Sequence, residues 1–125
     1  IYEYKGVRIL GLGGCMQYIP GAENQYTERD MHARIRKLRW KLWRKKGFDI
    51  LVTHAPAKGV NDMEDLPHQG FQAFCDLIKK YVPAYFIHGH VHANYGSSFK
   101  RKDTYGSTRV INAYEFYVID YPPEE

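Results

Sequence analysis

The sequence lacks a disulfide framework and any long hydrophobic run. Its 125 residues contain two cysteines, Cys15 and Cys75. These are too few for the cross-linked scaffold of a small secreted domain, so we expect a cytoplasmic protein. No apolar stretch approaches the ~20 residues that a membrane-spanning helix needs, so no membrane partner is expected. Apolar residues make up 44% and charged residues 26%, which is the balance of a folded domain and excludes intrinsic disorder.

Acidic residues are nearly absent from one segment, residues 29–46. Nine of the chain's 18 lysines and arginines lie there, with one of its 14 acids, Asp30. Trp40 and Trp43 stand among these cations, so binding of nucleic acid through phosphate contacts and base stacking is one interpretation. The interpretation that we favour is a solvated helix face whose long side chains cover the sheet. Trp40 falls opposite the apolar stripe of this helix, and we expect it to be exposed.

The hydrophobic pattern predicts a single α/β domain of mostly parallel strands followed by antiparallel ones. Continuous apolar runs indicate the buried strands, and alternating patterns indicate the later ones. The expected strands are 7–11, 48–53, 84–87, 109–113 and 116–121, with a hairpin over 97–105.

Two amphipathic helices are predicted between these strands. The first runs from residue 27 or 29 to residue 46, and Gly47 ends it. The second covers 70–81 and stops before Pro83. Apolar residues at helical spacing support both helices: Met31, Ile35, Leu38 and Leu42 in the first, and Phe71, Phe74, Cys75 and Ile78 in the second.

Histidines follow two of the predicted parallel strands. His54 comes directly after the strand 48–53, and His88, His90 and His92 end the strand 84–87. Imidazole is a common ligand for zinc, manganese and iron. Adjacent parallel strands lie ~4.8 Å apart and end at the same edge of a sheet. We therefore expect His54 and His90 to converge on one metal ion.

The motifs around these histidines, DILVTHAP, HGHVH and GSTRVINAY, resemble the C-terminal half of calcineurin-like metallophosphoesterases. The resemblance extends from about residue 7 to residue 121 and implies a partial metallophosphoesterase β-sandwich flanked by helices. It implies that His54 and His90 bind one metal ion and His92 a second. The resemblance further implies that the metals are Mn, Fe or Zn and that a hydroxide between them attacks the phosphorus of a phosphoester.

The N-terminal motifs of that family, D-x-H, GDxxD and GNH, do not occur in their proper context. The one D-x-H, Asp30-Met31-His32, opens the basic helix instead of following a buried strand. We interpret Asp30 as a first-turn acid and His32 as a surface residue. Residues 1–125 therefore correspond to the C-terminal part of the domain. The catalytic residues are expected in a missing N-terminal half, and partial or no metal occupancy is expected here.

Two further histidines are candidates with two interpretations each. His88 is either a group that orients a metal ligand or an ordinary hydrogen-bonded histidine at a strand end. His68 either lines the substrate pocket or lies on the surface of a loop, and we favour the loop surface. The acids Asp62, Glu64 and Asp65 are interpreted as solvated loop residues. Asn112 and Tyr114 are expected to shape the sheet edge without a catalytic role.

The sequence thus favours a metal-dependent phosphoester hydrolase, a phosphatase or a phosphodiesterase, that is inactive as this chain alone. One alternative is a non-catalytic module of the same fold that binds a metal or a partner. The other is a nucleic-acid binder acting through residues 29–46. Half of a two-sheet sandwich exposes apolar surface, so self-association is also expected.

Overall fold

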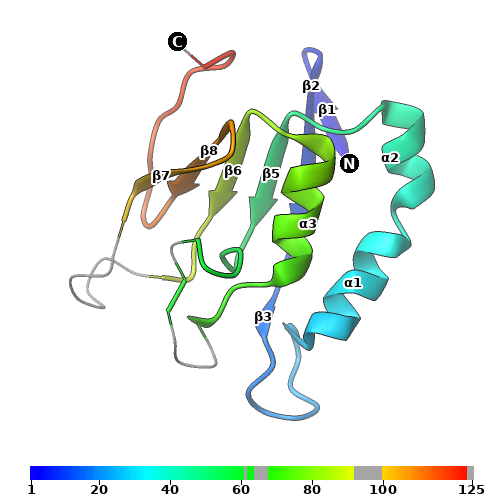
Figure 1. Cartoon of the computed structure of the whole chain (residues 1–125), viewed down its shortest axis with the longest axis vertical. Coiled ribbons are helices and arrows are strands. Elements are labelled where there is room, and N and C mark those ends of the chain that lie inside the picture. The colour runs from blue at the N-terminus through cyan, green and yellow to red at the C-terminus, as the bar shows by residue number, and fades with distance from the viewer. Residues whose placement is uncertain (61, 64–67, 92–99, 124–125) are drawn as a thin grey trace.

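The structure is a computed structural model, and it describes residues 1–60, 62–63, 68–91 and 100–123. A six-stranded mixed sheet lies at its centre, and the helices cover one face of this sheet (Figure 1). The predicted α/β class is confirmed. The sheet runs in the order β1 (Tyr2–Tyr4), β2 (Val7–Leu12), β5 (Ile50–Thr53), β6 (Tyr85–His88), β8 (Thr108–Asn112) and β7 (Lys102–Tyr105).

Strand direction separates the inner strands from the edges. Strands β2, β5, β6 and β8 pair in parallel, while β1 and β7 pair antiparallel with β2 and β8. The hydrophobic run Ile50–Thr53 lies at the centre of the sheet, as is typical of parallel strands, and all of its residues except Val52 are buried. Strand β1, at one edge, was not predicted. Two further short strands, β3 (Cys15–Met16) and β4 (Gln25–Tyr26), pair with each other inside the predicted loop 13–28.

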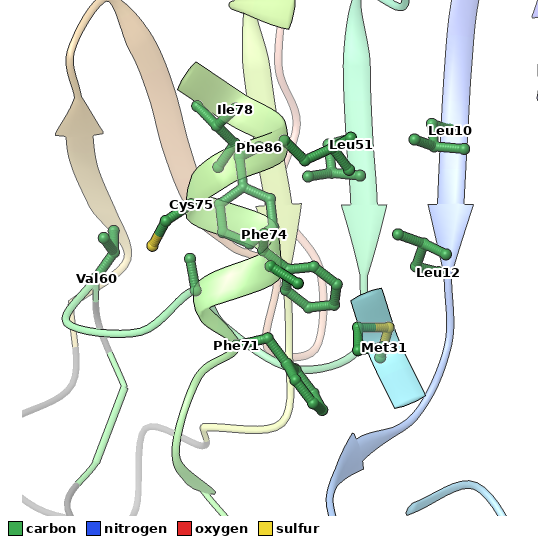
Figure 2. Packing of buried hydrophobic residues seen from close by; sticks show 14 of the residues in the cluster. Leu10, Leu12, Met31, Leu51, Val60, Phe71, Phe74, Cys75, Ile78 and Phe86 are labelled. Carbon is green, nitrogen blue, oxygen red and sulfur yellow. The ribbon is translucent and has the colours of Figure 1, made fainter. Parts of the chain in front are cut away.

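The main core lies between the sheet and α3 (Gln72–Tyr81). Figure 2 shows Phe74 and Ile78 of this helix against Leu51 and Phe86 of the two central strands. All four side chains are buried, and burying a side chain of this size contributes about 1.5–3 kcal/mol. The apolar spacing that predicted α3 therefore also identifies its buried face.

The predicted helix over 27–46 is two helices, α1 (Glu28–Arg36) and α2 (Arg39–Lys45). Between them the chain tightens, and Leu38 N–H donates to the Ile35 carbonyl three residues back. In one continuous helix Lys37 would face Lys41 across one turn, and like charges at that spacing disfavour a helix. None of the helices within the described ranges is long and apolar enough to cross a membrane.

Lys46 and Gly47 follow the last residue of α2 and stop the helix. Both have positive φ, 58° for Lys46 and 96° for Gly47. Gly47 N–H donates to the Leu42 carbonyl at 2.9 Å, which closes the last turn. A Cβ atom at Gly47 would also come within 3.1 Å of the Tyr81 ring. Glycine is needed here both for the turn and for the close approach of α3.

The second face of the sheet is covered mainly by an extended segment, 116–120. Tyr117 and Ile119 pack on a small cluster of Ile50, Tyr85 and Ile111. The predicted strand over 116–121 is wrong, although its alternating pattern is real. The segment packs its inward side chains on the face of the sheet. Its backbone therefore does not lie beside another strand and cannot form the hydrogen bonds of a sheet. Val52 remains 39% exposed on this side. The larger apolar surface expected from the sequence stays a prediction.

Candidate functional site

Two histidines meet at the edge of the sheet where β5 and β6 end. The strands pair in parallel with Val52 beside Ile87, so both chains leave the sheet at the same edge. His54 follows β5 directly. The Gly89 N–H, just after β6, donates to the His54 carbonyl at 3.0 Å. This bond extends the pairing by one step and fixes the two loops relative to each other.

The side chains of His54 and His90 are in direct contact. His54 Nε2 lies 2.8 Å from His90 Nδ1, at a solvent-accessible position. The predicted convergence of the two imidazoles is confirmed. One of the two nitrogens must carry the hydrogen of this bond and the other must accept it.

The backbone at His90 has an uncommon conformation. His90 has φ 68°, and the Val91 N–H donates to the Gly89 carbonyl at 2.8 Å. A bond between residues two apart around a central residue of positive φ belongs to the rarer and strained form of γ-turn. Strained conformations persist only where the surroundings hold them, and they cluster at functional sites. Here the turn directs the His90 ring toward His54.

Two buried polar side chains hold this turn in place. His88 Nδ1 lies 3.1 Å from the Gly89 carbonyl, which leaves Nδ1 as the protonated nitrogen. Asn112 donates from Nδ2 to the Val91 carbonyl at 2.7 Å and accepts from Tyr114 N–H at 3.0 Å. Asn112 thus holds the turn that carries His90, a function that sequence reasoning missed. The only signal was a polar residue at the end of an apolar strand.

His88 is an uncharged histidine at neutral pH. It is 1% exposed, and burial lowers its pKa to about 4. Among the residues that the structure describes, Nε2 of His88 is the one buried side-chain polar atom with no hydrogen-bond partner. A buried acceptor without a hydrogen-bond partner destabilises the fold, so its presence indicates a function other than packing. The hydrogen bond to Gly89 fits both interpretations of His88, as a group that orients a metal ligand and as an ordinary hydrogen-bonded histidine at a strand end.

His68 also lies at the histidine pair. Its ring stacks on that of His90, with ring centroids 4.7 Å apart and an angle of 29° between the planes. His68 is half-buried in its loop, and this contact places it beside the histidine pair. That it lines a substrate pocket stays a prediction. Asp62 accepts a hydrogen bond from Gly70 N–H at 2.9 Å, in keeping with a structural function in the loop. Glu64 and Asp65 lie outside the described residues, as does His92.

The motif Asp30-Met31-His32 is structural, as predicted. Thr27 and Asp30 form a capping box at the start of α1, with each side chain bound to the other residue's N–H. His32 Nε2 lies 3.2 Å from Glu28 Oε2 within the same helix. Met31 is buried in the core. None of the three residues joins the site at the ends of β5 and β6.

The distance between the His54 and His90 ring nitrogens is slightly shorter than the distance between two nitrogens that bind the same metal ion. Two ligand bonds of about 2.1 Å at angles of 90° to 109° place the nitrogens about 3.0–3.4 Å apart. The observed 2.8 Å between His54 and His90 is a few tenths of an ångström short of this range. In the described part of the chain, no group of three or more His, Cys, Asp or Glu residues could hold a metal ion. The described residues therefore offer half of a ligand set.

No family model matches the chain, and no curated protein matches it. Among solved structures, the chain is similar to the crystal structure of TT1561 of Thermus thermophilus. The two are 20% identical with a TM-score of 0.50, and the match covers 85% of this chain and 43% of TT1561. At this identity the likeness is one of fold alone. The chain spans less than half the length of the protein whose fold it shares.

Proposed function

We propose that this chain is part of a metal-dependent phosphoester hydrolase of the calcineurin-like type. The observation that carries the proposal is the 2.8 Å contact between His54 Nε2 and His90 Nδ1 at the ends of two parallel strands. In this proposal His54 and His90 hold one metal ion, and His92 holds the second. The phosphoester substrate is a monoester or a diester, and the proposed location is the cytoplasm.

The residues of this chain act here by orientation. The γ-turn at His90 and its hydrogen bonds from His88 and Asn112 fix the direction of one imidazole. Two metal ions, Mn, Fe or Zn, would acidify a water molecule and neutralise phosphoryl oxygens when bound. In this proposal His68, which stacks on His90, contacts the substrate. A bridging carboxylate and an acid for the leaving group are expected from an N-terminal half of the domain.

Metal titration tests the proposal directly. We expect Zn²⁺ or Mn²⁺ to bind weakly to the 125-residue chain in isothermal titration calorimetry, because two or three imidazoles make an incomplete shell. His54→Ala and His90→Ala should each weaken binding at least tenfold. His32→Ala is the matched control, since His32 pairs with Glu28 away from the site and its removal should leave the titration unchanged.

Activity separates a hydrolase from a non-catalytic module of the same fold. The chain alone should hydrolyse an aryl phosphate barely above background. Addition of an N-terminal half, fused or as a separate chain, should restore metal-dependent turnover, and His54→Ala or His92→Ala should abolish it. Metal binding without restored turnover would favour the module. Ordinary enzymatic rates from the chain alone would contradict the claim that its site is incomplete.

A further inference from the structure

A large groove lies at the other end of the sheet from the histidines. It is formed by α2 and the last turn of α3, and three aromatic side chains, Trp40, Trp43 and Tyr81, line it. Its volume is ≈ 1050 Å³. Lys46 and Gly47 of this groove precede β5 in the sequence, and Tyr81 precedes β6. His54 and His90 follow the other ends of these two strands. We refer to it as the α2–α3 groove.

The two tryptophans of the α2–α3 groove are open to solvent. Trp40 is 66% and Trp43 72% exposed. Their ring centroids lie 6.0 Å apart and the ring planes are at 89°, so the edge of one ring meets the face of the other. Each indole ring has two faces, and in this edge-to-face contact the pair itself covers only one of the four. Leu42, between them in sequence, is buried and anchors α2 to the core.

Among the residues that the structure describes, the charged side chains that line the groove are all cationic. They are Arg39, Arg44, Lys46 and Lys80, and no described carboxylate joins them. Lys80 also stands over the Tyr81 ring, with Nζ 5.3 Å from the centroid. A smaller hollow that shares Arg39 and Lys80 contains one acid, Asp76. The groove therefore combines a positive potential with flat aromatic surfaces.

We propose that the α2–α3 groove binds single-stranded nucleic acid. Bases would stack on Trp40 and Trp43, and backbone phosphates would pair with Arg39, Arg44 and the two groove lysines. Single strands present alternating phosphates and unpaired bases, and proteins bind them with positively charged grooves and aromatic stacking platforms. The observations that support this occupant are the single sign of charge and the two exposed indoles.

An anionic membrane is the alternative ligand for cations and tryptophans. A helix that inserts into a membrane surface turns its apolar face to the lipid. In α2 the aliphatic residue Leu42 is turned into the protein core instead. The tryptophans also line a hollow, which suits a flat ligand that enters between side chains. These features favour the nucleic acid.

Fluorescence anisotropy with a labelled single strand of about 20 nucleotides tests the proposal. EDTA is present throughout, so the outcome is independent of the proposed metal site. We expect binding of single-stranded DNA or RNA that weakens steeply with salt. Trp40→Ala with Trp43→Ala should weaken binding about tenfold or more per stacked base. Arg39→Gln with Arg44→Gln should reduce the slope of log K against log salt by about 1.4.

Matched controls use residues that do not line the groove. Phe116→Ala removes an aromatic side chain that is 79% exposed, and Lys5→Gln with Lys58→Gln removes two exposed charges. Both controls should bind as the unmodified chain does. If the double alanine variant unfolds in a urea titration, Trp40→Phe with Trp43→Phe replaces it, and a severalfold loss is expected.

Four outcomes would overturn the proposal. The first is an absence of binding at low salt. The second is binding that the tryptophan and arginine variants leave unchanged. The third is tryptophan-dependent binding to phosphatidylserine vesicles without binding to the oligonucleotide, which would assign the groove to membranes. A preference for double-stranded DNA over single strands would also contradict the stacking that the two indoles imply.

Discussion

The carboxylate of Glu28 caps a helix that begins 44 residues later in the sequence. Its Oε1 accepts the Gln72 N–H at 2.7 Å, and its Oε2 accepts the Ala73 N–H at 2.8 Å. Helix α3 has no cap of its own, because Phe71 occupies the cap position without a side-chain bond. A negative charge at a helix N-terminus is also favoured by the helix dipole. The first residue of α1 thus satisfies the open end of α3.

Removal of this cap should destabilise the whole fold. We expect Glu28→Ala to lower the free energy of unfolding by about 1–2 kcal/mol, the range of a lost helix cap. Urea denaturation followed by circular dichroism measures this difference. Glu3→Gln is the control, since Glu3 pairs with Lys45 at an exposed position and such pairs contribute less than about 1 kcal/mol. Equal effects of the two variants would contradict the capping function.

Asp49 should make the protein sensitive to acid. Its carboxylate accepts hydrogen bonds from Arg8 Nη2 at 2.7 Å, Arg8 Nε at 3.1 Å and Arg8 N–H at 2.8 Å. The side-chain bonds of Arg8 are the main cause of a lowered pKa at Asp49. A lowered folded pKa contributes stability that is fully present above the unfolded value, ~3.9, and is lost as pH falls through the folded value.

Asp49→Asn should therefore cost stability at neutral pH but not in acid. We expect a loss of about 1–2 kcal/mol at pH 7. The unfolding free energies of variant and unmodified chain should converge as pH falls below ~4. Urea titrations at several pH values give both curves. If the difference in unfolding free energy between the two proteins stays constant down to pH 2, the ion pair between Arg8 and Asp49 is not the cause of the lost stability.

Asn112 should position the metal site without touching the metal. Asn112→Ala removes the donor to Val91 and the acceptor for Tyr114 N–H, so the turn that carries His90 should loosen. We expect the affinity for Zn²⁺ to fall about tenfold, as for other groups that orient metal ligands. Calorimetric titration of the variant measures this change.

Thr108→Val is the matched control for Asn112. Thr108 lies in the same strand, is equally buried and donates to the Pro83 carbonyl at 2.7 Å. Its loss should destabilise the fold by about 1–3 kcal/mol while leaving the Zn²⁺ affinity unchanged. If both variants weaken metal binding equally, Asn112 acts through general stability alone.

The second face of the sheet should promote self-association. Val52 is 39% exposed at the centre of this face, and Ile87 beside it is half-buried. We expect the apparent mass in light scattering to rise with concentration, and Val52→Thr to reduce that rise. Val82→Thr is the control, because Val82 is 55% exposed at the end of α3, on the side of the sheet that the helices cover. A monomer at all concentrations would contradict this prediction.

The sequence predicted best what local spacing controls. The apolar face of α3, the strand ends at His54 and His90, and the place of Asp30 in the first turn of α1 all follow from short-range patterns. The sequence-based prediction failed where contacts between residues far apart in the chain determine the structure. Segment 116–120 alternates like a strand, yet it lies across the sheet because its tyrosine and isoleucine fill the exposed face.

The functions of Asn112 and Glu28 could not be predicted for the same reason. Asn112 acts on a turn 21 residues away in the chain, and Glu28 acts on a helix 44 residues away. The stacking of His68 on His90 likewise joins two separate loops. Such contacts depend on packing, and no spacing in one sequence specifies them.

The direction of the parallel strands has a consequence for how the chain could change. Residues of the α2–α3 groove precede β5 and β6, and the paired histidines follow them. Each strand therefore separates the proposed polyanion-binding groove from the proposed metal-binding end. We expect substitutions at one end to leave the hydrogen bonds of the other intact. Such an arrangement would let selection alter the proposed groove without disturbing the proposed metal site.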